Sequence, residues 1–322
     1  MGDFVTGDIS IKKLVALLLY VLAISGIFAA DGQDWQHELA DAQAALANGD
    51  KALAFKQYKQ QAEKGNPLAQ FTLGWYLKSG WLDGIVDRKT ACDWFQRSTK
   101  HNIPVGLQET GHCFRDSIIT SENPAQDAIE YYVEAQRNGV FAAACDSLVI
   151  EVTSLNMKQP TQVDSCEQAA AQNAVYAQEI LIELYTTNAH LKNNQRALYW
   201  LEQAAPKSGK SAYRYALTLN SSEQVPKSDV IYWFETSATM GYLPAYLDTA
   251  ASYYKQITPE LPSQQASEYL AKAFLWSKAW LARKEKGHIQ PDWITQILQE
   301  TPKAWHQELE IKVQQHLAKF VS

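Results

Sequence analysis

The chain has 322 residues, of which 46% are hydrophobic and 20% are charged, and this composition excludes a disordered chain. Its 15 glycines and 11 prolines are few for this length, which favours helices over a β protein with many turns. The net charge of −6 disfavours general binding to nucleic acid, which needs a basic surface, and it disfavours acidic partners as well.

The first thirty residues have the features of a secretory signal peptide. Lys12 and Lys13 precede an uncharged apolar run at residues 14–30, and polar sequence follows at once. The small residues Ala29 and Ala30 suit a cleavage site near this point. An uncleaved anchor is the alternative, because the apolar run has about the minimum length that can span a bilayer. In either case we expect the rest of the chain to be exported, to a bacterial periplasm or as a secreted protein.

A repeat with a period near 36 residues organises the next part of the chain. Each boundary has the pattern of a helix end, a Gly or Asn, and then small and aromatic residues. The markers of the six boundaries are Gly65, Asn102, Gly139, Asn173, Gly209 and Gly241. Gly and Asn suit a helix terminus because both adopt the left-handed backbone conformation there. Recurring aromatic residues such as Trp94, followed by small residues such as Ala135, predict close packing between helices.

The first full unit carries a distinctive series of residues. The series consists of Ala69, Gln70, Leu73, Gly74, Gly80, Gly84, Asp87, Lys89, Ala91 and Trp94. It resembles the Sel-like repeat, a slightly longer relative of the tetratricopeptide repeat, although Leu77 stands where an aromatic is expected and Tyr76 lies one residue early. About six degenerate units are expected over residues 45–256, and the segment 146–165 fits poorly.

The resemblance implies an all-α fold, a right-handed superhelical solenoid of stacked antiparallel helix pairs. Each pair cannot bury its apolar stripe alone, so neighbouring pairs stack and share a continuous core. We expect this solenoid to span residues 31–256.

Four cysteines predict two disulfides in an exported chain. Residues equidistant from the turn of an antiparallel helix pair face one another. Cys92 and Cys113 are centred on the Asn102 marker, and Cys145 and Cys166 are centred in a polar stretch at 154–160. Pairing Cys113 with Cys145 would instead place the centre inside a helix predicted at 127–136. A zinc site is the alternative, but no two cysteines have a short metal-binding spacing, so we expect no metal.

The last part of the chain predicts a helical cap. Residues 257–265 contain Pro259 and Pro262 and predict a break after the repeats. Residues 266–287 and 301–320 then predict two long helices. We expect residues 257–322 to cover the final repeat, as terminal units with a polar outer face usually do.

The sequence contains no recognisable catalytic motif. No two of the seven histidines are three or four residues apart, and neither a phosphate-binding loop nor a nucleophile elbow is present. Both cysteine pairs are expected to be bridged, which leaves no free thiol as a nucleophile. We therefore expect no catalytic residues, no cofactor and no enzyme.

The resemblance implies a binding surface instead. Similar repeat proteins hold peptides or proteins on the concave side of the stacked helix pairs. Aligned units place six candidate residues on that side: Phe71, Trp75, Lys78, Glu109, His112 and Arg115. The alternative for Trp75 is core packing.

The function implied is a monomeric, non-catalytic scaffold or regulator in the cell envelope. Its expected partner is a protein, a peptide or a cell-wall-associated molecule. Nucleic acid is not expected, nor is a membrane beyond a possible N-terminal anchor. The alternative is a disulfide-rich hydrolase acting on the cell wall or on β-lactams, an activity linked with some members of the family that the chain resembles.

Overall fold

The structure is a computed structural model that describes residues 34–285 and 287–320. This part of the chain is all helical, and no strand occurs in it. It divides into two compact units, of which the first ends at Asn194 and the second begins at Gln195. The predicted signal peptide at 1–30 lies outside the described residues. None of the helices between residues 34 and 320 that the structure describes is long and apolar enough to cross a membrane.

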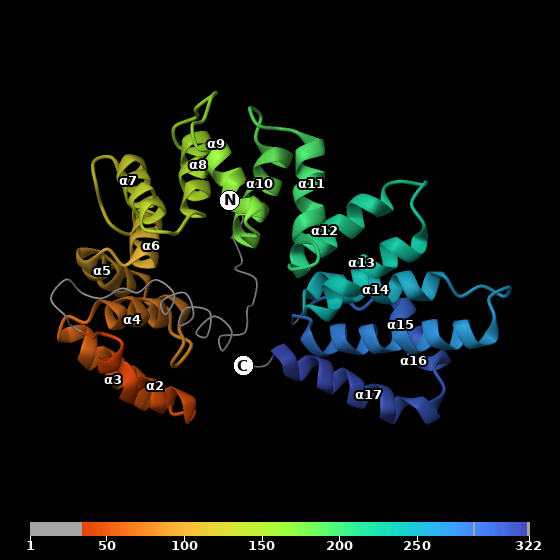
Figure 1. The fold of residues 1–322 in the computed structure, drawn as a ribbon. Helices are drawn as coiled ribbons and strands as arrows, with labels where there is room; N and C mark the ends of the chain where they lie inside the picture. Colours follow the sequence, from red (N-terminus) through yellow and green to blue (C-terminus); the bar gives the residue numbers. More distant parts are fainter. Residues whose placement is uncertain (1–33, 286, 321–322) are drawn as a thin grey trace. The chain divides into compact units, whose positions relative to one another are not determined.

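The first unit consists of helices that pack against their neighbours in chain order (Figure 1). These are η1 (His37–Leu39), α2 (Ala40–Ala47), α3 (Lys51–Glu63), α4 (Pro67–Ser79), α5 (Arg88–Ser98), η2 (Thr99–His101), α6 (Pro104–Arg115), α7 (Pro124–Arg137), α8 (Ala143–Thr153), α9 (Val163–Ala171) and α10 (Val175–Thr187). Helices α4, α6 and α8 pair with α5, α7 and α9, respectively. We call α4, α6, α8 and α10 the A helices and α5, α7 and α9 the B helices.

Local sequence signals begin and end these helices. The side-chain oxygen of Asn66 accepts hydrogen bonds from the backbone N–H groups of Leu68 and Ala69, which caps α4 before its proline start. Gly80 ends α4 in the left-handed conformation, with φ of 64°. Asp87 caps α5 by accepting from the Thr90 N–H at 3.0 Å.

Two glycines allow the A and B helices to approach closely. A Cβ atom at Gly74 would lie 2.7 Å from the ring of Phe95, and one at Gly111 would lie 2.5 Å from the ring of Tyr132. These residues occupy equivalent positions in consecutive repeats, so the same glycine-to-aromatic contact occurs twice. It brings the ring of Tyr132 to 5.4 Å from that of His112.

Five of the six boundary markers adopt the expected left-handed conformation. They are Gly65, Asn102, Gly139, Asn173 and Gly241. The expectation is wrong for Gly209, which is the first residue of α12 behind the N-cap Ser208. The preceding turn at 205–207 already ends the previous helix. A Cβ at Gly209 would lie 3.0 Å from the Cβ of Tyr242, so close packing explains this glycine.

Two disulfides join the pairs predicted from the sequence. Cys92 of α5 is bonded to Cys113 of α6, with Cα atoms 5.9 Å apart, and Cys145 of α8 is bonded to Cys166 of α9, with Cα atoms 4.7 Å apart. The turn at the centre of the second hairpin contains Asn156, which is left-handed like Asn102. Equal distance from the hairpin turn therefore predicted both disulfide pairs correctly.

The segment that fits the repeat poorly is organised by a buried carboxylate. Glu151 of α8 accepts hydrogen bonds from the backbone N–H groups of Thr161 at 2.7 Å and Gln162 at 3.1 Å. Thr161 and Gln162 immediately precede α9, and Gln162 is its N-cap residue. Glu151 thus ties the loop at 154–162, including the N-cap residue of α9, to α8.

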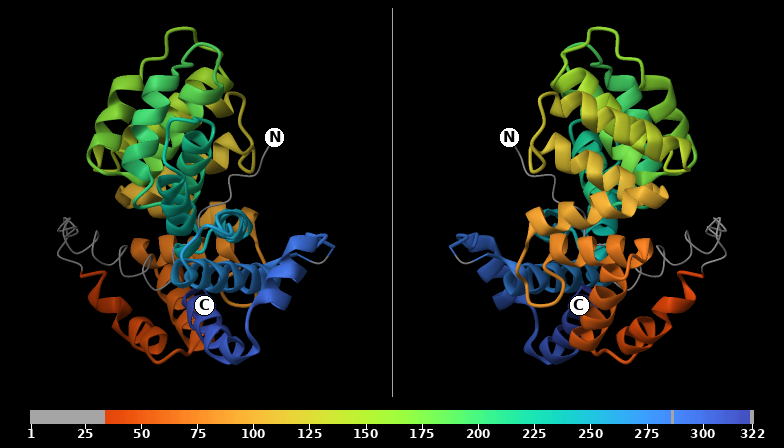
Figure 2. Two further views of the ribbon diagram at one scale, coloured as in Figure 1. Left: turned by 90° about the vertical axis from the view of Figure 1, so that its right-hand side faces the viewer. Right: turned by 90° about the vertical axis from the view of Figure 1, so that its left-hand side faces the viewer.

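The second unit contains further helix pairs and ends in longer helices. It contains α11 (Asn194–Ala204), α12 (Gly209–Asn220), α13 (Lys227–Thr239), α14 (Leu243–Lys255), α15 (Ser263–Arg283), α16 (Asp292–Glu300), α17 (Lys303–Leu317) and η3 (Ala318–Phe320). The long helices α15 and α17, drawn in blue in Figure 2, correspond to the two predicted ones and pack together. Their core includes Tyr246, Phe274 and Trp276. The short helix α16 was not predicted.

Candidate functional site

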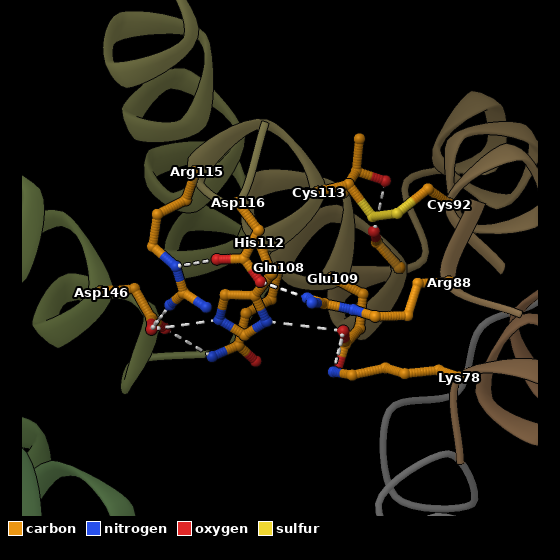
Figure 3. Close-up of polar contacts among 12 residues, drawn as sticks. Lys78, Arg88, Cys92, Gln108, Glu109, His112, Cys113, Arg115, Asp116 and Asp146 are labelled. Carbon is orange, nitrogen blue, oxygen red and sulfur yellow. Dashed lines mark hydrogen bonds and ion pairs between the residues drawn. A yellow bond between two sulfur atoms is a disulfide. The ribbon is translucent and has the colours of Figure 1, made fainter. Parts of the chain in front are cut away.

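Residues of the A helices form a charged network in the first unit (Figure 3). Lys78 Nζ lies 2.6 Å from Glu109 Oε2, and the same oxygen lies 3.4 Å from His112 Nδ1. His112 Nε2 lies 3.1 Å from Asp146 Oδ1. The contacts run from α4 through α6 to α8. Four of the six predicted surface residues therefore lie together, namely Lys78, Glu109, His112 and Arg115.

Asp146 is the centre of this network and the most buried of its charged residues, with 1% of its side chain exposed. Its carboxylate accepts hydrogen bonds from Gln108 Nε2 at 2.7 Å and from the Tyr176 hydroxyl at 2.5 Å. Arg115 Nη1 forms an ion pair with it at 3.7 Å. Asp146 also lies in the first turn of α8, where the helix dipole favours a negative charge.

A second carboxylate extends the network to the start of α5. Arg115 Nε donates to Asp116 Oδ1 at 2.9 Å, and Arg88 forms an ion pair with the other oxygen of Asp116. We define the charged network as Lys78, Arg88, Gln108, Glu109, His112, Arg115, Asp116, Asp146 and Tyr176.

The network shifts the pKa values of its titratable members. Burial alone would lower the pKa of His112, but the carboxylates of Asp146 and Glu109 outweigh this effect and raise it to about 9. Burial would raise the pKa of Glu109, but Lys78 and His112 outweigh this effect and lower it to about 2. Burial, followed by Asp146, raises the pKa of the Tyr176 hydroxyl. His112 is therefore cationic at neutral pH, Glu109 is anionic, and Tyr176 is a donor.

We expect stability to depend on pH through His112. Its pKa is 6.5 in the unfolded chain and about 9 in the folded protein, so the folded protein holds a proton that the unfolded chain releases. The stabilisation is complete below pH 6.5 and is lost as the pH rises to about 9. The loss should be about 3 kcal/mol. Glu109 acts in the opposite direction, and its contribution is lost as the pH falls from 4.5 to about 2.

Urea unfolding at pH 6 and at pH 9.5 measures the alkaline loss. The variant His112→Gln should lose most of the pH dependence between these values, whereas His190→Gln, at an exposed position in the same unit, should retain it. An equal change in the free energy of unfolding between pH 6 and pH 9.5 in the wild-type protein and in His112→Gln would contradict the assignment of this pH dependence to His112.

Comparison with known proteins supports the fold. No family model and no curated protein matches the sequence. Among solved structures, a Sel1 repeat protein from Oxalobacter formigenes is 20% identical, with a TM-score of 0.53 over 76% of this chain and 74% of that one. A protective antigen with an SLR fold, present in uropathogenic Escherichia coli strains, is 16% identical, with a TM-score of 0.50 over 90% of this chain and 70% of that one. The fold is the Sel-like repeat solenoid.

Within this Sel-like repeat fold, the network contains one ion pair that occurs twice. Lys78 and Arg115 occupy equivalent positions in consecutive repeats, thirteen residues after the marker, and Glu109 and Asp146 occupy equivalent positions seven residues after it. The cation of one repeat thus pairs with the acid of the next repeat. At the next boundary, the position of the cation holds Val152 and the position of the acid holds Ile180. Both residues are buried and apolar. This ion pair is therefore not continued at the next boundary between repeats.

The repeat register could have identified Asp146 from the sequence, because it aligns with Glu109. The poor fit of the segment 146–165 concealed that signal. No sequence pattern identified Arg88, Gln108 or Tyr176, whose roles depend on contacts with other helices.

The expectation that Phe71 contributes to the binding surface is wrong. Its side chain is 3% exposed, and its ring lies 5.8 Å from that of Phe95 in α5. Helices α4 and α5 are antiparallel, so the end of α5 covers the start of α4. Phe71 is therefore a core residue. Trp75, one turn further along α4, is partly buried and lies close to Lys78 on the helix surface.

The acidic residues of the network are held by cationic and hydroxyl groups and do not form a metal site. In the part of the chain that the structure describes, no group of three His, Cys, Asp or Glu residues has an arrangement that could hold a metal ion. The arrangement instead fixes the side chains that contact the carboxylates, which are those of Lys78, Arg88, Arg115 and Tyr176. Trp75, Lys78, Arg88, Arg115 and Tyr176 are partly or largely exposed, and we call these five residues the network surface.

Proposed function

We propose that this chain is a non-catalytic interaction scaffold that binds a partner protein or peptide through the network surface. One observation carries the proposal: a cationic and an aromatic side chain of the A helices, Arg115 of α6 and Tyr176 of α10, are held in fixed positions by the buried carboxylate of Asp146. Trp, Tyr and Arg are the residues most enriched among those that dominate binding energies. Side chains that are already ordered lose less entropy when they bind.

The proposed location is the cell envelope, with the protein exported as a monomer. Two buried disulfides support this location, because disulfides form and persist in oxidising compartments such as the periplasm. Direct sequencing of the N-terminus of the exported protein would test cleavage near Ala30.

We expect Trp75→Ala to weaken partner capture about tenfold or more while leaving the melting temperature nearly unchanged. The measurement is quantitative affinity capture from envelope extracts, followed by mass spectrometry. Tyr232→Ala is the matched control, because this exposed aromatic residue lies on α13 in the second unit. A stability loss of about 3–5 kcal/mol would instead identify Trp75 as a core residue and contradict its binding role. Equal loss of capture in both variants would contradict the network surface.

Hydrolysis of the cell wall or of β-lactams is the alternative function. The Tyr176 hydroxyl donates to Asp146, but burial and this carboxylate raise its pKa, which makes it a poor nucleophile. His112 is protonated at neutral pH, so it is unable to act as a general base there. Turnover of a chromogenic β-lactam or of isolated peptidoglycan tests this alternative. Activity above that of a mock purification, abolished by Asp146→Asn or His112→Gln, would overturn the scaffold proposal.

A further inference from the structure

We propose that the network surface binds an acidic peptide segment, one in which Asp or Glu side chains follow each other closely. The inference rests on the proposed scaffold function and names the chemistry of the partner. It follows from an imbalance between the donors and acceptors of the charged network.

The acceptors of the network are buried and occupied. Asp146 accepts from Gln108 and Tyr176 and contacts two cations. Glu109 is shared between Lys78 and His112, and its side chain is 18% exposed. These carboxylates therefore offer little to an incoming ligand.

The donors, in contrast, are exposed to solvent and have N–H groups beyond those that contact the carboxylates. The side chains of Lys78, Arg88 and Arg115 are 37%, 53% and 34% exposed. An ammonium has three N–H groups and a guanidinium has five. Among the described residues, Lys78 contacts one carboxylate and Arg88 contacts one carboxylate, so each retains N–H groups for a ligand. A ligand that fits these groups supplies acceptors, and carboxylates are the matching acceptors in a peptide.

The local charge differs from the charge of the whole chain. The network contains four cations, Lys78, Arg88, His112 and Arg115, but only three carboxylates, whereas the chain carries −6. The overall charge disfavours acidic partners, but at contact distance the nearest charges dominate because salt screens charges beyond about 8 Å.

The exposed aromatic residues add contacts for a peptide, and the small number of exposed cations disfavours nucleic acid. The ring of Tyr176 is partly exposed while its hydroxyl is held by Asp146, and Trp75 lies beside Lys78 on α4. Such rings add apolar contacts for a peptide backbone and its side chains. Nucleic acid binding relies on neutralising many phosphates, which three exposed cations on an acidic protein do not provide.

Fluorescence anisotropy of a labelled hexaglutamate peptide with the full exported chain tests the inference. Hexaglutamate should bind about tenfold or more tightly than hexaglutamine, and its affinity should fall as salt is added. Arg115→Gln should weaken binding of hexaglutamate about tenfold, and Lys78→Gln and Arg88→Gln should each weaken it several-fold. Arg137→Gln is the matched control, because this exposed α7 arginine pairs with Glu134 away from the network and should leave affinity unchanged.

Several outcomes would overturn the inference. The first is equal affinity for hexaglutamate and hexaglutamine. The second is binding of hexaglutamate that none of the three network variants weakens. The third is an oligothymidylate probe that binds more tightly than hexaglutamate and whose binding the same variants abolish. If Arg115→Gln fails to fold, as judged by circular dichroism, the more exposed Lys78 and Arg88 variants decide. Partner capture that depends on Trp75 without any preference for hexaglutamate would overturn the acidic peptide alone and leave the scaffold proposal intact.

Discussion

Replacing all four cysteines with alanine should lower the free energy of unfolding by about 6 kcal/mol, because each disulfide closes a loop that would otherwise be free in the unfolded chain. Both bridges join residues 21 positions apart. For a loop of this length, the chain-entropy estimate is about 3 kcal/mol per bridge. The two loops do not overlap in the sequence, so their contributions should add.

Urea unfolding of the wild-type protein, the two double variants and the quadruple variant provides the measurement. Reductant should destabilise the wild-type protein and leave the quadruple variant unaffected, which separates the loss of the bridge from the effect of alanine in the core. A quadruple variant within about 1 kcal/mol of the wild-type protein would contradict the prediction. Non-reducing peptide mapping should find Cys92 joined to Cys113 and Cys145 joined to Cys166, with no free thiol.

The second large effect is expected from Asp146→Ala, which should cost about 3–5 kcal/mol. The change leaves His112 and Arg115 without their shared buried carboxylate. It also removes the acceptor of Gln108 and of the Tyr176 hydroxyl. Breaking a buried ion pair on one side is costly because the remaining charge stays out of water without compensation.

The matched control is Glu134→Ala, which removes an exposed carboxylate that pairs with Arg137 and should cost less than about 1 kcal/mol. Chemical denaturation compares the two variants. NMR titration adds a readout that cavity formation alone does not produce: in Asp146→Ala the pKa of His112 should fall from about 9. An unchanged His112 pKa, or equal stability losses in the two variants, would contradict the role of Asp146.

The helices and the disulfide pairing were predictable from the sequence because both depend on nearby residues. Asn66 and Asp87 cap the helices that follow them, and the left-handed Asn102 ends the helix before it. Once a hairpin turn is located, the 3.6-residue period determines which residues of its two helices face each other. Cys92 and Cys113 follow from the turn at Asn102 in this way.

The pairing of residues within the charged network was decided only by the tertiary structure. The alignment placed Lys78, Glu109, His112 and Arg115 on the same side of the A helices, but it did not reveal that Lys78 pairs with Glu109 or that His112 lies against Asp146. These partners are 31 and 34 residues apart, so their contact depends on how successive A helices pack.

The same dependence explains why periodicity alone does not predict the burial of Phe71. Phe71 and Trp75 share one side of α4 by periodicity, yet Phe71 is buried against Phe95 of α5, whereas Trp75 remains partly exposed. Periodicity sets the direction of a side chain from its own helix, whereas burial depends on which neighbouring helix lies opposite. Burial is therefore determined only when the helices pack together, and it decides which side chains remain available to bind a partner.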